Sequence, residues 1–162
     1  MNNKILIADD EPSIVVALEF LLRRSGYEVH VARNGDEALR LVEATHPDLV
    51  LLDVMMPQKS GYEVCMRIRE RADWRNIKII MLSAKGRDAE VSKGLSMGAD
   101  VYVTKPFSTR ELTEKIKELL GQSAEAGPAL GIRGRLTVIR IMLVLQFVAL
   151  QYRSWPKKPT FV

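Results

Sequence analysis

Short apolar runs alternate with amphipathic stretches over most of this chain, from Lys4 to Leu120. This alternation predicts repeated strand and helix units, and therefore a doubly wound α/β fold in which helices cover both faces of a parallel sheet. Three runs are continuously apolar, as central strands require, whereas the run at Glu28 alternates and fits an edge strand. The five strands are predicted at residues 5–8, 28–32, 49–52, 79–82 and 101–104.

Residues that begin and end helices stand at the right places between these runs. Pro12 suits a first helical turn, because that turn leaves its backbone N–H groups without partners in any case. Asn34 can cap the next helix, and Ser108 with Glu111 three residues later has the spacing of a capping box. Gly121 is predicted to end the last helix. Five helices therefore accompany the five strands.

Acidic residues close two of the apolar runs: Asp9 and Asp10 follow the first, and Asp53 ends the third. The carboxyl ends of parallel strands meet at one edge of a sheet, where open α/β folds bind their ligands. A cluster of carboxylate oxygens suits Mg²⁺, which prefers octahedral oxygen coordination and recruits phosphate oxygens as further ligands. The sequence therefore predicts a magnesium site at this edge.

Two later strands end in a hydroxyl and an ammonium group, on Ser83 and Lys105. An ammonium group beside several carboxylates offsets their repulsion and can bind a phosphoryl oxygen, and a hydroxyl group can donate to another. With the carboxylates, these groups indicate a phosphoryl-transfer site.

The composition changes after the last predicted helix. Residues 1–121 are predicted to form one domain, 122–135 a linker rich in glycine and proline, and 136–162 a basic and apolar tail. From Pro128 onward there are six basic residues and no acidic one, so the net charge of +4 comes from the tail. The tail suits an interfacial membrane contact, a hydrophobic partner groove, or no evolved role at all.

Several classes of function are disfavoured by what the sequence contains. The lone Cys65 indicates a buried thiol and not a nucleophile, and the N-terminus does not resemble a signal peptide, which favours the cytoplasm. Four arginines alternate with acids in one predicted helix and the turn after it, so a solvated mixed-charge surface is favoured over nucleic-acid binding. These arginines are Arg67, Arg69, Arg71 and Arg75.

Four stretches of this sequence resemble the receiver domain of bacterial two-component response regulators. They read ILIADDEP, LVLLDVMMPQKSGYEV, IIMLSAKG and GADVYVTKPF, and the resemblance covers residues 4–120. It implies a five-stranded parallel sheet of order 2-1-3-4-5. It also implies a switch that is phosphorylated on an aspartate.

The resemblance assigns a role to each site residue. Asp53 would be the phosphoacceptor, and Mg²⁺ would be bound by Asp9, Asp10, Asp53 and the backbone carbonyl of Met55. Ser83 and Lys105 would contact the phosphoryl group, and the Lys105–Pro106 peptide would be cis. Tyr102 would be the switch aromatic. Met55 and Lys85 would flank the path of the hydrolytic water.

The resemblance also implies partners. A histidine kinase or phosphotransfer protein would supply the phosphoryl group, and a downstream protein would read the changed surface; direct nucleic-acid binding is not expected. The chain would catalyse only its own phosphorylation and dephosphorylation. Val101 stands where a dimerising subfamily has a second acid, so a monomer or weak dimer is expected. The alternative is a magnesium-dependent phosphatase that forms an aspartyl phosphate, although such enzymes place a second acid where Met55 stands.

Overall fold

The computed structural model describes residues 3–84 and 88–121, all within the first of the two compact units of the chain, Met1–Ala124. Its centre is a five-stranded parallel sheet of order β2-β1-β3-β4-β5. The doubly wound fold and this strand order were both expected from the sequence, and both are confirmed. The strands are β1 (Lys4–Ala8), β2 (Glu28–Ala32), β3 (Leu49–Asp53), β4 (Lys78–Ser83) and β5 (Val101–Thr104).

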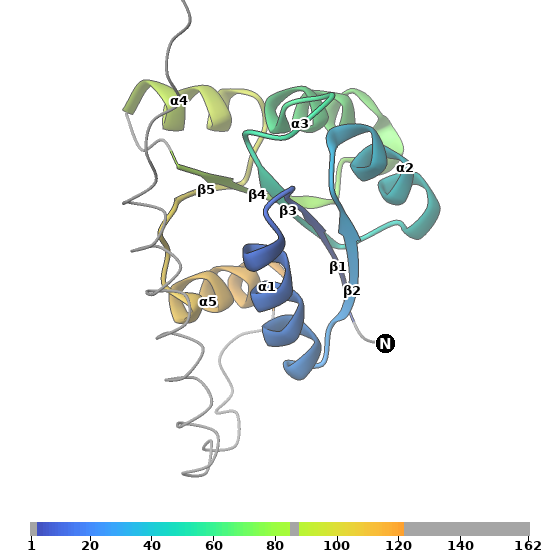
Figure 1. Cartoon of the computed structure of the whole chain (residues 1–162). Helices are drawn as coiled ribbons and strands as arrows, with labels where there is room; N and C mark the ends of the chain where they lie inside the picture. The colour runs from blue at the N-terminus through green and yellow to red at the C-terminus, as the bar shows by residue number, and fades with distance from the viewer. Residues whose placement is uncertain (1–2, 85–87, 122–162) are drawn as a thin grey trace, which may run out of the picture. The chain divides into compact units, whose positions relative to one another are not determined.

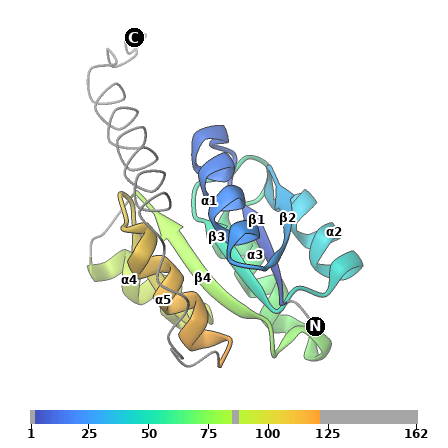
Figure 2. The same ribbon diagram turned by 90° about the horizontal axis from the view of Figure 1, so that it is seen from below.

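Helices cover both faces of the sheet (Figure 1). Helices α1 and α5 lie on one face, and α2, α3 and α4 lie on the other. The view from below shows α1 and α5 together on the near side of the strands (Figure 2). The elements are α1 (Pro12–Arg24), α2 (Gly35–Thr45), α3 (Gly61–Glu70), the 3₁₀ turn η1 (Ala72–Trp74), α4 (Asp88–Ser96) and α5 (Thr109–Leu119).

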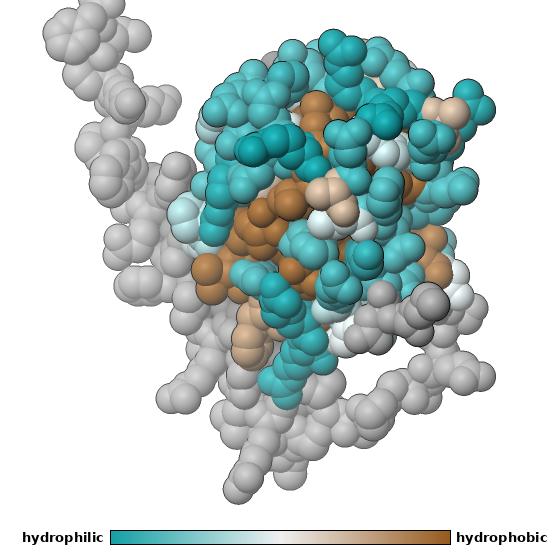
Figure 3. All heavy atoms as spheres, turned by 90° about the vertical axis from the view of Figure 1, so that its right-hand side faces the viewer, coloured by the Kyte–Doolittle hydropathy of each residue, from teal (hydrophilic) through white to brown (hydrophobic). Residues whose placement is uncertain are grey.

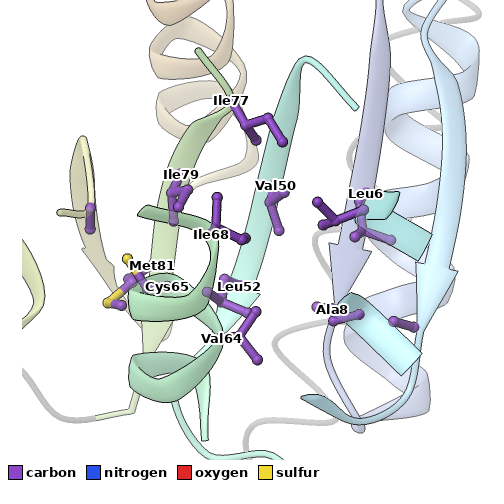
Figure 4. Packing of buried hydrophobic residues seen from close by; sticks show 14 of the residues in the cluster. Leu6, Ala8, Val50, Leu52, Val64, Cys65, Ile68, Ile77, Ile79 and Met81 are labelled. Carbon is purple, nitrogen blue, oxygen red and sulfur yellow. The ribbon is translucent and has the colours of Figure 1, made fainter. Parts of the chain in front are cut away.

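Each face of the sheet has its own hydrophobic cluster. Figure 4 shows the cluster between α3 and the sheet, where Val64 and Ile68 point toward Leu52 and Ile79. Cys65 is fully buried in this cluster, and burial raises the pKa of its thiol to about 11, so the structural interpretation of this cysteine is confirmed. Strands β1, β3 and β4 contribute side chains to both clusters, as their continuous apolarity predicts.

Strand β2 is an edge strand, as its alternating sequence predicts. Its exposed Glu28 pairs with His30 at 2.9 Å between Oε1 and Nε2. The face that carries β2 and α2 shows apolar residues framed by hydrophilic ones (Figure 3). A charged side chain on an edge strand discourages pairing with another chain, and Glu28 is such a residue on β2.

The predicted helix ends are largely present. The Asn34 side chain accepts a hydrogen bond from the backbone N–H of Glu37 at 2.8 Å, and Gly121 follows α5 with φ of 67°. Ser108 caps α5 through the N–H of Glu111. The full reciprocal capping box lies instead at α3, between Ser60 and Glu63.

None of the helices within residues 3–84 and 88–121 combines the length and apolar character needed to cross a membrane. The predicted linker 122–135, the tail 136–162 and Lys85 lie outside the described residues.

Candidate functional site

Three carboxylates converge at the carboxyl edge of the sheet. Ala8 of β1 and Leu52 of β3 are register partners, so the residues that follow them, Asp9 and Asp53, emerge side by side. One carboxylate oxygen from each of Asp9, Asp10 and Asp53 lies within 4.8 Å of the other two. Asp9 and Asp53 are buried, whereas Asp10 is exposed. The convergence expected from the sequence is therefore present.

Lys105 joins two of these carboxylates from the far end of the sequence. Its Nζ lies 2.7 Å from Oδ2 of Asp9 and 2.8 Å from Oδ1 of Asp53. The backbone N–H of Lys105 donates to the carbonyl of Ser83 at 2.7 Å, and this bond fixes the loop that carries the ammonium group. The Lys105–Pro106 peptide is cis, as expected.

Backbone N–H groups orient the two buried carboxylates. The N–H of Glu11 donates to Oδ1 of Asp9 at 2.9 Å, and the N–H of Met55 donates to Oδ2 of Asp53 at 3.0 Å. Each carboxylate thus shares one oxygen with Lys105 and the other with a backbone N–H. These contacts hold both side chains in place.

The buried charges of this cluster shift the pKa values of two groups. Burial raises the pKa of Asp9, although hydrogen bonds from Lys105 and from the N–H of Glu11 act in the opposite direction. Burial by itself lowers the pKa of Lys105, but its hydrogen bonds to Asp53 and Asp9 and their negative charges outweigh burial and raise it. Lys105 therefore stays protonated, and its positive charge is part of the site.

Gly61, the first residue of α3, lies directly against the backbone of Asp53. A Cβ atom at Gly61 would lie 2.2 Å from the carbonyl oxygen of Asp53 and 3.0 Å from the Cα of Val54. The N–H of Gly61 donates to the carbonyl of Val54 at 3.0 Å. Only glycine permits this approach, so the Gly61 of the SGYEV stretch has a steric explanation that sequence reasoning did not supply.

The donor set fits a hard divalent cation. All three side chains offer carboxylate oxygens, and the exposed Asp10 leaves one side of the cluster open to water. Mg²⁺ binds carboxylates while keeping several waters, so a partly open cluster suits it. Met55, two residues after Asp53, is 61% exposed.

Ser83 lies on β4, the strand next to β3, and Tyr102 lies on β5, the edge strand beyond β4. Ser83 ends β4, is fully buried and is the register partner of Thr104. Tyr102 pairs in register with Met81 and packs partly buried against the cluster that contains α3. Tyr62 of α3 packs against the same cluster, and burial together with the neighbouring Tyr102 raises the pKa of Tyr62 to about 12. Sequence reasoning did not single out Tyr62, since this proximity joins α3 to β5 across 40 residues and leaves no local signal.

Comparison with known proteins gives consistent relatives. Residues 5–117 match the family model of the response regulator receiver domain. The alkaline phosphatase synthesis transcriptional regulatory protein PhoP of Bacillus subtilis (strain 168) is 46% identical over 129 residues, which are 80% of this chain and 53% of that protein. The chain thus spans about half the length of this curated relative.

Solved structures agree with the sequence matches. A CheY-like response regulator receiver domain protein from Methanospirillum hungatei JF-1 has a TM-score of 0.70 at 32% identity, and covers 78% of this chain and 100% of its own. The receiver domain of the Francisella response regulator 1452 gives the same TM-score and identity, over 76% and 100%. With the family match over most of its length, the chain belongs to the response regulator receiver domain family.

Proposed function

We propose that Asp53 accepts a phosphoryl group from a histidine kinase or phosphotransfer protein, with Asp9, Asp10, Asp53 and the Met55 carbonyl as the Mg²⁺ ligands. The observation that carries this proposal is the ammonium group of Lys105, which contacts both Asp9 and Asp53. It offsets carboxylate repulsion where an incoming phosphoryl group would add more negative charge. Such a receiver is a switch, and its chemistry would be limited to its own phosphorylation and dephosphorylation.

The transfer follows from the position of the Asp53 carboxylate. One of its oxygens would attack the phosphorus atom in line, the new O–P bond would form as the N–P bond of the phosphohistidine breaks, and the electron pair would leave with the imidazole nitrogen. Bound Mg²⁺ would neutralise charge on the non-bridging phosphoryl oxygens. Lys105 would move its ammonium group from the Asp53 carboxylate to the phosphoryl group. In dephosphorylation, a water oxygen would attack the phosphorus atom as the O–P bond to Asp53 breaks, which would release inorganic phosphate and restore the free carboxylate.

We infer that phosphorylation is read through Ser83 and Tyr102. The Ser83 hydroxyl group would donate to a phosphoryl oxygen and draw in the loop after β4. Tyr102 would then change rotamer and alter the surface of α4, β5 and α5, where a downstream protein would bind. Support comes from their adjacent strands: Ser83 pairs with Thr104, two residues after Tyr102.

The phosphatase alternative is not favoured. Met55 occupies the position two residues after Asp53, and a thioether cannot act as a general acid. The family match argues in the same direction.

Intact-mass measurement tests the phosphoacceptor. The full chain is incubated with Mg²⁺ and a small-molecule phosphodonor, alongside Asp53→Asn. We expect the mass of one phosphoryl group to be added to the wild type and none to Asp53→Asn, and we expect the gain to disappear in EDTA. Equal labelling of Asp53→Asn would show that another residue accepts the group.

We also propose that the tail, residues 136–162, contacts an anionic membrane surface. Its support is the charge pattern, because all six charged residues from Pro128 onward are basic. Basic residues flanking an apolar stretch attract anionic lipid headgroups.

A further inference from the structure

The loop that joins β3 to α3, residues 54–60, lies beside the carboxylate site. The backbone N–H of Met55 in this loop donates to Oδ2 of Asp53 at 3.0 Å. Under the proposed function, the carbonyl of the same residue would bind Mg²⁺. The loop leads into α3, which lies next to α2 on one face of the sheet (Figure 1). Contacts that fix the path of this loop therefore also fix the backbone around the Asp53 carboxylate.

This loop contains a tight turn in an unfavourable conformation. The N–H of Lys59 donates to the carbonyl of Pro57 at 2.9 Å, which closes a turn of three residues. Its central residue, Gln58, has a φ of 68°, in the left-handed region that residues other than glycine rarely adopt. Three-residue turns with a positive φ at the centre are rare and strained. Such strain persists only where the surrounding structure holds the chain in place.

The first turn of α2 makes contacts that hold this loop turn. The N–H of Gly35, the first residue of α2, donates to the carbonyl of Pro57 at 3.4 Å. The Asp36 carboxylate forms an ion pair with the ammonium group of Lys59. The first N–H groups of a helix have no partner inside the helix, so a carbonyl oxygen from outside is well placed there. Both ends of the loop turn are thus tied to α2.

Gly35 allows the helix and the loop to come this close together. A Cβ atom at this position would lie 2.4 Å from the carbonyl oxygen of Lys59 and 2.5 Å from its Cβ. Neither of these atoms can move aside unless the backbone of the loop moves with it. Gly35 begins a helix and has no positive φ, so the helix itself would favour alanine over glycine at this position. The glycine therefore serves the loop and not the helix.

We propose that the first turn of α2 is a brace for the β3–α3 loop, and that Gly35 and Asp36 thereby position the Met55 backbone for Mg²⁺ binding. This role rests on the function proposed above, because Mg²⁺ ligation by the Met55 carbonyl is part of that function. Both residues act through the loop, so they are positioning residues and not ligands.

The test titrates the full chain with MgCl₂ and follows ¹H–¹⁵N NMR spectra of the wild type and Gly35→Ala. We expect the Mg²⁺ dissociation constant to rise about tenfold in Gly35→Ala, the lower end of what loss of an outer contact costs a metal site. A second readout needs no metal. In EDTA, amide exchange at Met55 and Lys59 should speed up in Gly35→Ala relative to exchange at Leu51, in the middle of β3.

Gly26→Ala is the matched control. Gly26 has a φ of 88°, and a Cβ atom there would have no neighbour within 4 Å. Alanine therefore strains the turn between α1 and β2 without displacing another part of the chain. We expect Gly26→Ala to lower the free energy of unfolding but to leave the Mg²⁺ dissociation constant and the relative exchange rates unchanged. A rise in the dissociation constant equal to that of Gly35→Ala would show that any loss of stability has this effect, and would overturn the brace.

A charge exchange tests the brace from the ion pair and guards against misfolding of Gly35→Ala. Asp36→Lys places two ammonium groups together, so we expect it to loosen the loop and weaken Mg²⁺ binding. The double variant Asp36→Lys with Lys59→Asp restores opposite charges and the net charge of the wild type. It should recover both the dissociation constant and the exchange rates. A double variant no better than Asp36→Lys alone would overturn the role of Asp36.

The outcomes separate the brace from the function on which it depends. If the wild type binds Mg²⁺ no more tightly than Asp53→Asn, the proposed metal site is wrong, and exchange in EDTA still decides whether α2 holds the loop. If the wild type binds Mg²⁺ and Gly35→Ala matches it in both readouts, the brace alone is overturned. If only the exchange rates change, the loop is held by α2 without consequence for Mg²⁺, and the positioning role is overturned.

Discussion

At the scale of single residues, the site keeps a buried carboxylate that weakens the fold. Asp9 is fully buried and its pKa is raised, chiefly by burial. A raised pKa means that the folded chain favours the protonated form more than the unfolded chain does. The stabilising contribution is thus complete below the unfolded value of 3.8 and is lost as pH rises through the folded pKa. At neutral pH the ionised Asp9 costs stability.

We therefore expect Asp9→Asn to be more stable than the wild type at pH 7 in EDTA, by about 1 kcal/mol. Lys105 keeps its pair with Asp53 in this variant. Urea unfolding measures the difference, which should shrink toward acidic pH. Asp10→Asn is the control, because Asp10 is exposed and its change should stay within about 0.5 kcal/mol. A variant less stable than the wild type at pH 7 would contradict the burial argument.

At the scale of helices and strands, Arg69 connects α3 to two other elements. Its guanidinium group donates to the carbonyls of Gly98 and Ile77, each at 2.8 Å, and to Oδ2 of Asp100 at 2.9 Å. The same Asp100 oxygen accepts from the N–H of Ile79 at 2.7 Å. One side chain thus ties the end of α3 to the start of β4 and to the turn before β5.

We expect Arg69→Met to lower the free energy of unfolding by about 2–3 kcal/mol, because it leaves two carbonyls and a carboxylate without this donor. Methionine keeps most of the aliphatic stem that packs against Gly98. Arg67→Met is the matched control two residues away, since Arg67 is exposed and pairs with Glu70 at 3.2 Å, a surface contact worth under about 1 kcal/mol. Urea unfolding and amide exchange at Ile79 distinguish the two. Equal losses would show that Arg69 is not a special connection.

The sequence pattern predicted the strands and helices well, but it did not predict the side-chain contacts that connect them. The strands agree with the predicted bounds to within one residue, because burial on both faces produces continuous apolar runs. The mixed-charge surface holds for Arg67 and Arg71, which pair with Glu70 and Glu43, but is wrong for Arg69. A sequence pattern alone predicts that an arginine among acidic residues is exposed to solvent. The carbonyls that Arg69 binds become apparent only when the position of α3 against the sheet is known.

The candidate site could likewise be predicted from the sequence only in part. The convergence of Asp9, Asp53 and Lys105 could be predicted, because strand ends in a parallel sheet point to one edge. The packing of the Tyr102 ring against α4 could not, since it depends on the space left at Gly94 of that helix. Sequence reveals where strands end more readily than how helices lie against them.

At the scale of the whole molecule, charge is unevenly distributed along the chain. Residues 1–127 hold 18 basic and 20 acidic side chains, and the remainder holds six basic and none acidic. The two parts would therefore respond in opposite ways to an anionic lipid surface.

We expect the full chain to float with liposomes that contain anionic lipids, and a chain ending at Gly121 to stay behind. Binding should weaken as salt rises, because lipid attraction of this kind is screened. Liposomes of neutral lipid are the control and should capture much less of the full chain. Equal flotation of the two chains would remove the membrane proposal and leave a protein partner, or no role, for residues 122–162.

The pairing of Lys105 with two acids has a further consequence for the charge balance of the carboxylate cluster. Three carboxylates and one internal counter-ion give two net negative charges. One divalent cation would make such a cluster electroneutral, whereas a monovalent ion would leave it anionic. Under the proposed function, a phosphoryl donor would thus meet a repulsive cluster in a sodium buffer and a neutral one with magnesium, so metal availability by itself would gate the reaction.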